Sequence, residues 1–123
     1  MGRVLVATAS VHTTAAACDY LEDRLGSGDT VVVLTVEDGS VAGRDAGDAA
    51  NVARTRLLEP AVETRTRDGD PAAAIQQVAD EADVDEIVVG QTRGDPDTAG
   101  TAPGSTVRTL LAGTAYPVVV LPV

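Results

Sequence analysis

The stretch Asp70–Gly90, DPAAAIQQVADEADVDEIVVG, contains the pattern of a helix followed directly by a buried strand. Asp70 and Pro71 are typical of a helix start, because Asp caps free N–H groups and Pro tolerates the first helical position. One helix face then collects the apolar residues Ile75, Val78, Ala79 and Ala82. The continuous apolar run Ile87–Val89 is typical of a strand covered on both faces, as in a parallel sheet.

The alternation of helix and strand continues on both sides of this stretch. Apolar or β-branched runs predict further strands at Val4–Ala7, Thr30–Val36, Ala61–Arg67 and Val118–Leu121. Further helices are predicted at Thr14–Leu25, Asp48–Leu58 and Ser105–Ala112, and the polar segment Glu37–Gly47 is predicted to be a loop. This order predicts an α/β fold in one domain, residues 1–123. The fold is a doubly wound, five-stranded parallel sheet with helices on both faces, which is Rossmann-like.

The third of these strands alternates Val62, Thr64 and Thr66 with charged residues, so it is predicted to be exposed and edge-like. In doubly wound sheets, ligands bind beyond the carboxyl ends of the strands, where the strand order reverses. The loops that follow the first, second and fourth strands are therefore where a site is expected.

The composition is acidic and almost free of aromatic residues. The chain has 44% hydrophobic residues but no Phe or Trp, so the core must consist of Val, Leu, Ile and Ala. The formal net charge is −10, and all nine basic residues are Arg. Two interpretations remain open, an acidic partner-binding surface and adaptation to high salt. The spread of Asp and Glu along the chain favours the halophilic one.

These features exclude several classes of protein. Nucleic-acid binding is not expected, because no cluster of basic residues exists. Cys18 is the one cysteine, so an intramolecular disulfide cannot form. No signal-peptide pattern opens the sequence and no apolar run is long enough to cross a membrane, so a cytoplasmic protein is expected. His12 is predicted to be exposed near a helix start, since one histidine makes neither a metal centre nor a triad.

The long loop Gly90–Thr106, GQTRGDPDTAGTAPGST, ends where the last helix is predicted to begin. Free N–H groups and the positive end of the helix dipole at Gly104–Thr106 suit a phosphate group, and Arg93 could bind it in a bidentate manner. Asp95 and Asp97 would repel a phosphate unless a Mg²⁺ ion lies between them. The alternative is a solvated acidic loop that binds nothing.

With these motifs the chain resembles the universal stress protein family. The family signature is Gly, two residues, Gly, nine residues, then Gly-Ser or Gly-Thr. Gly94 followed by nine residues and Gly104-Ser105 is similar to it, as are Glu86–Gly90, Gly69–Ala72 and Tyr116–Val120. The resemblance covers the whole chain and is most specific in its C-terminal half. It implies an adenine-nucleotide α-hydrolase-like fold.

The resemblance also implies a site for ATP, accompanied or not by Mg²⁺, and a homodimer paired through the strand Val118–Leu121. It implies a cofactor-binding set made of Ala7, Thr8, Ala9, Val36, Gly90, Arg93, Gly94, Gly104, Ser105 and Thr106. Two departures are visible. Three residues separate Gly90 from Gly94, and Ala9 stands where the family usually has an Asp that contacts the adenosine part.

The sequence lacks the residues that other nucleotide-linked functions require. A response regulator needs an acidic pair after the first strand and a lysine, and a Walker-type NTPase needs G-x-x-x-x-G-K-[ST]. No nucleophile and base pattern is present, so the protein is not expected to be an enzyme. Two hypotheses remain, a nucleotide-binding regulatory protein of the stress response and a dimeric interaction module that binds no nucleotide.

Overall fold

A computed structural model describes residues 2–8, 10–37, 43–91 and 105–122 of the chain. Five strands form one sheet in the order β3-β2-β1-β4-β5, and every neighbouring pair is parallel. The strands are β1 (Arg3–Ala7), β2 (Thr30–Glu37), β3 (Ala61–Asp68), β4 (Glu86–Gly90) and β5 (Val118–Leu121). The helices are α1 (Val11–Leu21), α2 (Gly43–Arg56), α3 (Pro71–Ala82) and α4 (Ser105–Gly113). The predicted doubly wound α/β fold is confirmed.

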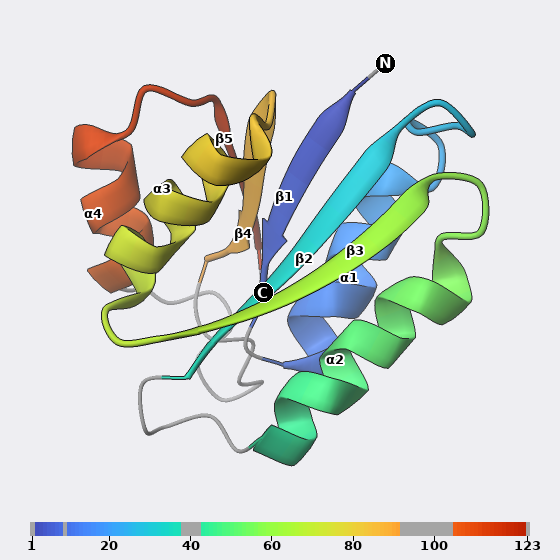
Figure 1. The fold of residues 1–123 in the computed structure, drawn as a ribbon, viewed down its shortest axis with the longest axis horizontal. Coiled ribbons are helices and arrows are strands. Elements are labelled where there is room, and N and C mark those ends of the chain that lie inside the picture. The colour runs from blue at the N-terminus through green and yellow to red at the C-terminus, as the bar shows by residue number, and fades with distance from the viewer. Residues whose placement is uncertain (1, 9, 38–42, 92–104, 123) are drawn as a thin grey trace.

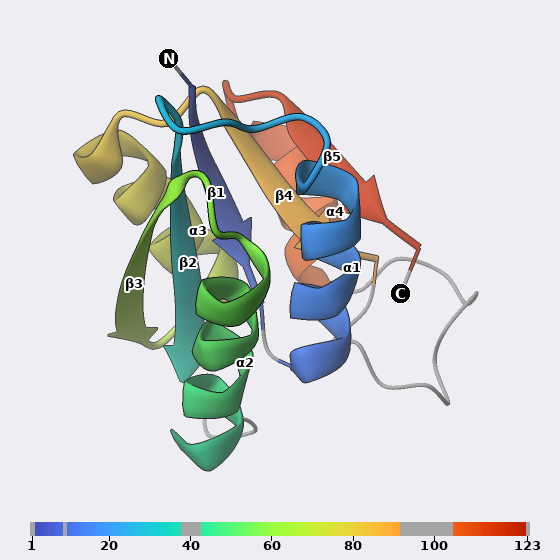
Figure 2. The same ribbon diagram turned by 90° about the vertical axis from the view of Figure 1, so that its right-hand side faces the viewer.

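The helices cover both faces of the sheet, α1 and α2 on one face and α3 and α4 on the other (Figures 1 and 2). Alternate residues of each strand therefore enter different cores. Leu5 packs with α3 and α4, whereas its neighbours Val4 and Val6 pack with α1 and α2. Both cores consist of Val, Leu, Ile and Ala with Cys18 and partly buried tyrosines, as the composition predicts.

The segment Gly69–Asp85 folds as its sequence predicts. Asp68-Gly69 forms a turn in which Gly69 has a φ of +103°, a conformation that suits residues without a Cβ. The Asp70 carboxylate accepts a hydrogen bond from the Ala73 N–H at 3.0 Å, and Pro71 begins α3. The apolar stripe of this helix is buried against the sheet.

Two helices differ from the prediction in their boundaries. Helix α1 begins at Val11 because the Ser10 hydroxyl caps it by accepting a hydrogen bond from the Thr13 N–H, and it ends at Leu21, four residues early. Helix α2 begins at Gly43, so the predicted loop is wrong from this residue onward. Packing of Ala49 and Ala53 outweighs the weak helix propensity of the glycines in its first turns.

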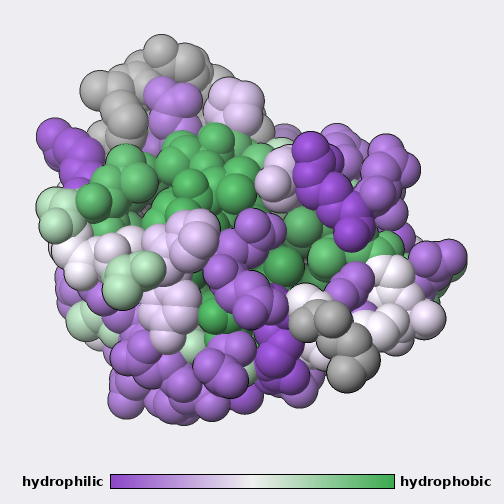
Figure 3. Space-filling model, turned by 90° about the horizontal axis from the view of Figure 1, so that it is seen from above, coloured by the Kyte–Doolittle hydropathy of each residue, from purple (hydrophilic) through white to green (hydrophobic). Residues whose placement is uncertain are grey.

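Strands β3 and β5 are the two edges of the sheet. The prediction that β3 is an edge strand is confirmed, and no residue of this strand is fully buried. In β5, Val118, Val119 and Val120 remain partly exposed. In Figure 3 a broad hydrophobic area appears on the side of the molecule where β5 and α4 lie.

Within the described ranges, no helix has the length and apolar character that a membrane crossing requires. His12 is exposed in the first turn of α1, as predicted, and Cys18 is buried on the same helix.

Candidate functional site

A cavity of about 200 Å³ lies at the carboxyl edge of the sheet. The chain forms β1, β2 and β3 in one direction and then returns to the other side of β1 for β4 and β5, so the strand order reverses between β1 and β4. The cavity lies at this reversal, as expected for a doubly wound sheet. Its lining consists of Ala7, Thr8, Thr13, Leu34, Val36, Pro71, Ile75, Val89, Gly90, Gln91, Ser105, Thr106 and Val107.

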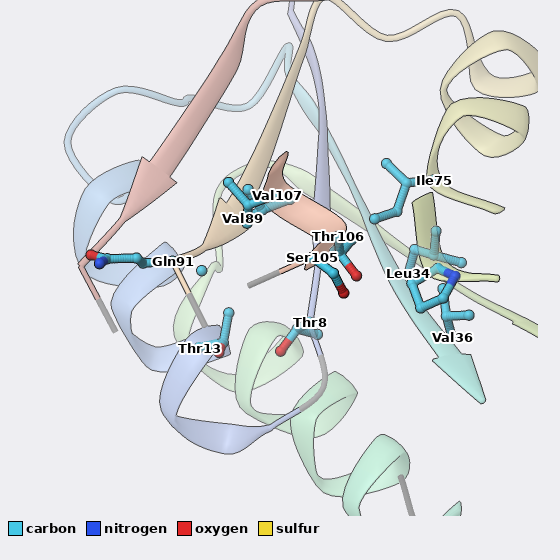
Figure 4. Close-up of a pocket in the computed structure, with 13 residues that line it drawn as sticks. Thr8, Thr13, Leu34, Val36, Ile75, Val89, Gln91, Ser105, Thr106 and Val107 are labelled. Atoms are coloured by element: carbon cyan, nitrogen blue, oxygen red, sulfur yellow. The ribbon is translucent and has the colours of Figure 1, made fainter. Parts of the chain in front are cut away.

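One wall of the cavity is apolar. Leu34 and Val36 come from β2, and Ile75 comes from the second turn of α3. Figure 4 shows these three side chains on one side of the cavity, with Val89 and Val107 toward the other side. All five side chains are buried in the core between the sheet and helices α3 and α4. This wall suits a flat, weakly polar group such as a nucleobase.

The start of α4 forms a second, polar part of the lining. Ser105 is the first residue of the helix and Thr106 the second, and both reach the cavity (Figure 4). The first N–H groups of a helix have no carbonyl partner within it, and the helix dipole is positive there. The two hydroxyls add further donors. The arrangement suits an anionic group such as a phosphate.

A network of hydroxyls between β1 and α1 forms the third part. The Thr8 hydroxyl donates to the Ser10 carbonyl at 2.8 Å and lies 2.9 Å from the Thr14 hydroxyl. The Ser10 hydroxyl lies 3.2 Å from the Thr13 N–H and 3.3 Å from the Thr13 hydroxyl. Thr8, Thr13 and Thr14 are all buried. This network fixes the turn and places the side chains of Thr8 and Thr13 at the cavity.

Among the described residues, the cavity lining contains no charged side chain. The same part of the chain holds no group of three or more His, Cys, Asp or Glu residues that could bind a metal ion. The described surface therefore offers a ligand hydroxyls, backbone groups and apolar contact.

Among the described residues, the groups with a shifted pKa are not part of the cavity lining. Burial raises the pKa of the Cys18 thiol, and hydrogen bonds to the carboxylates of Asp19 and Glu22 raise the pKa of Arg56. A hydrogen bond to Asp80 raises the pKa of the Tyr116 phenol. These shifts accompany packing and ion pairing.

Six of the ten residues predicted for the site line the cavity together. They are Ala7, Thr8, Val36, Gly90, Ser105 and Thr106. The other four, Ala9, Arg93, Gly94 and Gly104, lie outside the described residues.

The sequence analysis missed seven lining residues, which are Thr13, Leu34, Pro71, Ile75, Val89, Gln91 and Val107. Pro71 could have been found from its place in the first turn of a predicted helix. Thr13 lies one residue before the predicted start of its helix, so the predicted elements gave no signal for it. Ile75 and Val107 carry no such signal, because a core residue and a cavity-lining residue look alike in sequence.

Comparison with known proteins gives one family. The model of the universal stress protein family matches residues 1–122. No curated protein matches the chain by sequence.

Several solved structures share the fold. A universal stress protein in complex with cAMP is 22% identical, with a TM-score of 0.72, and the match covers 98% of this chain and 95% of that one. The universal stress protein from Archaeoglobus fulgidus in complex with dAMP is 18% identical, with a TM-score of 0.66 and coverage of 98% and 97%. A family member from Arabidopsis thaliana with AMP bound is 17% identical, with a TM-score of 0.66 and coverage of 98% and 91%.

Proposed function

The chain belongs to the universal stress protein family, and on this basis we propose that it is a regulatory protein that binds an adenine nucleotide, with ATP included, in the cavity at the carboxyl edge of its sheet. One observation carries the proposal. A buried apolar wall and the start of helix α4 meet in a single cavity at the reversal of strand order. An adenine nucleotide combines an apolar base with an anionic phosphate, so its two ends match these two surfaces.

In this arrangement the base contacts Leu34, Val36 and Ile75, and the phosphate accepts hydrogen bonds from the start of α4 (Figure 4). The complexes named above contain cAMP, dAMP and AMP, which share an adenine base and a phosphate. That shared chemistry supports the placement of the base at the apolar wall and of the phosphate at the start of α4.

The proposed activity is binding without catalysis. Among the described lining residues there is no His, Cys, Asp or Glu that could act as a general base or nucleophile. ATP would arrive as its Mg²⁺ complex, with the ion held by the phosphates.

The test is calorimetric titration of the protein with AMP and with Mg-ATP. We expect saturable binding by the unmodified protein. Ser105→Asp should weaken binding of AMP about ten-fold or more in 0.1 M potassium chloride, because a carboxylate at this position repels the phosphate. The same carboxylate is favourable for the first turn of a helix, so the fold should be retained.

Ser105→Asn is the matched control, since it has nearly the same shape without the charge. The difference between the two variants should shrink in molar salt, where the Debye length falls from about 10 Å to about 3 Å. Absence of binding at millimolar nucleotide would overturn the proposal and leave the interaction module as the function. Equal binding by both variants would show that the phosphate does not contact the start of α4.

We also propose that two copies pair through β5. This strand is an edge of the sheet, and its three valines are partly exposed. Leu111 of α4 is also exposed, at 57%. An apolar edge strand that is left uncovered promotes association. The hydrophobic area in Figure 3 lies on this side of the molecule.

A further inference from the structure

Thr13 lines the cavity with a buried side chain whose hydroxyl, within the described residues, acts only as an acceptor. The residue lies in the first turn of α1, is 2% exposed and lines the cavity. Its hydroxyl oxygen accepts a hydrogen bond from the Ser10 hydroxyl at 3.3 Å. Within the described residues, no acceptor takes the proton of the Thr13 hydroxyl. A buried donor of this kind gains most from a partner that enters the cavity.

The surrounding network fixes the direction of this hydroxyl. The Ser10 side chain contacts both the N–H and the hydroxyl of Thr13, at 3.2 and 3.3 Å. Thr14, the next residue, uses its own hydroxyl within the turn, 3.1 Å from the Ser10 carbonyl and 2.9 Å from the Thr8 hydroxyl. Thr14 does not line the cavity. The two adjacent threonines therefore differ, since of the two only Thr13 lines the cavity, and its hydroxyl has no acceptor among the described residues.

The position of Thr13 indicates which part of a ligand it meets. Figure 4 shows Thr13 on the side of the cavity away from Leu34, Val36 and Ile75. When the base contacts this apolar wall, the sugar and phosphate of the nucleotide extend toward Thr13. Both of these groups offer oxygen atoms as acceptors, and no carboxylate among the described lining residues competes for them.

We propose that Thr13 is a specificity-determining residue of the site, whose hydroxyl donates a hydrogen bond to an oxygen of the sugar-phosphate part of the nucleotide. This inference rests on the proposed nucleotide binding. The acceptor is a ribose hydroxyl or a phosphate oxygen. Ligands that lack one of these groups distinguish the two possibilities.

The experiment is a titration series with AMP, 2′-deoxy-AMP, 3′-deoxy-AMP and adenosine on the unmodified protein and on Thr13→Val. Valine has the shape of threonine without the hydroxyl. We expect Thr13→Val to weaken AMP binding about five-fold, as for one hydrogen bond. The loss should vanish for the one ligand that lacks the acceptor, which is adenosine for a phosphate contact or one deoxynucleotide for a ribose contact.

Thr14→Val is the control, because it removes a hydroxyl from the same turn, on a residue that is 1% exposed. It should lower the melting temperature without favouring any ligand over another. Thr13→Ser keeps the hydroxyl and should keep the selectivity of the unmodified protein. If Thr13→Val does not fold, Thr13→Ser is the variant that is measured.

A loss that is equal for all four ligands, or no loss, would overturn the role of Thr13 while leaving nucleotide binding intact. If the unmodified protein binds none of the four ligands and no ATP, the proposed function itself fails, and the role of Thr13 fails with it.

Discussion

Asp29 joins the start of the chain to the turn before β2. Its two carboxylate oxygens accept hydrogen bonds from the Gly26 N–H at 2.8 Å and from the Gly2 N–H at 2.6 Å. These backbone hydrogen bonds hold the pKa of Asp29 below its ordinary value of 3.8. Because the ionised form is the better acceptor, the link is tightest when Asp29 is charged.

Asp29→Asn should therefore change how stability depends on pH. With a lowered pKa in the folded state, the contribution of Asp29 is complete above pH 3.8 and is lost as the pH falls through the folded value. The difference in urea midpoint between the unmodified protein and the variant should be largest near neutral pH and shrink in acid. A difference that stays constant with pH would contradict this role.

At the scale of the elements, helix α3 connects the fold to the cavity. The Asp70 cap and Pro71 fix where the helix begins, and Ile75 one turn later contributes to the apolar wall. The helix ends at Ala82 and is followed by its C-cap, Asp83, which adopts a left-handed conformation with a φ of 53°. The cap therefore determines which residues of α3 reach the cavity.

Removal of the cap tests this connection. Asp70→Ala should lower the free energy of unfolding by about 1 kcal/mol, because the Ala73 N–H loses its acceptor. Asp70→Asn is the control, since its side-chain oxygen can still cap the helix, and it should cost clearly less. Urea unfolding followed by circular dichroism measures both, and equal losses would show that the charge and not the cap stabilises α3.

At the scale of the whole molecule, the two edges of the sheet differ in their exposed side chains. On β3, Arg65 and Arg67 contact Glu81 of α3 at 3.8 and 3.0 Å, so this edge carries a group of ion pairs. Charges on an edge strand discourage pairing with another sheet. On β5 the exposed side chains are valines, so this is the edge that a second copy is expected to cover.

Val119→Lys should therefore convert a dimer into a monomer, because a lysine on β5 opposes edge pairing. Thr64→Lys places the same residue on β3 and should leave the dimer intact. Light scattering in molar potassium chloride gives the mass, and high salt is needed because copies with a charge of −10 repel each other. A monomeric unmodified protein at micromolar concentration would rule out the dimer.

Local patterns in the sequence predict most of the elements correctly. The helix after Asp70 and the strand Ile87–Val89 appear where spacing and apolar runs place them. The start of α2 at Gly43 does not, because tertiary packing of Ala49 and Ala53 stabilises a segment with weak helix propensity. The start of α1 depends on the Ser10 cap, a signal that the sequence contains but that the apolar pattern outweighed.

The sequence by itself determined the α/β class, the edge position of β3 and the phosphate-compatible start of α4, because each depends on residues close together in the chain. The tertiary structure alone decided that Thr13, Ile75 and Thr106 share one cavity. These residues come from three helices that are separated by strands, and only the reversal of strand order between β1 and β4 brings them together. Such proximity follows from packing across the sheet, and a local spacing pattern does not encode it.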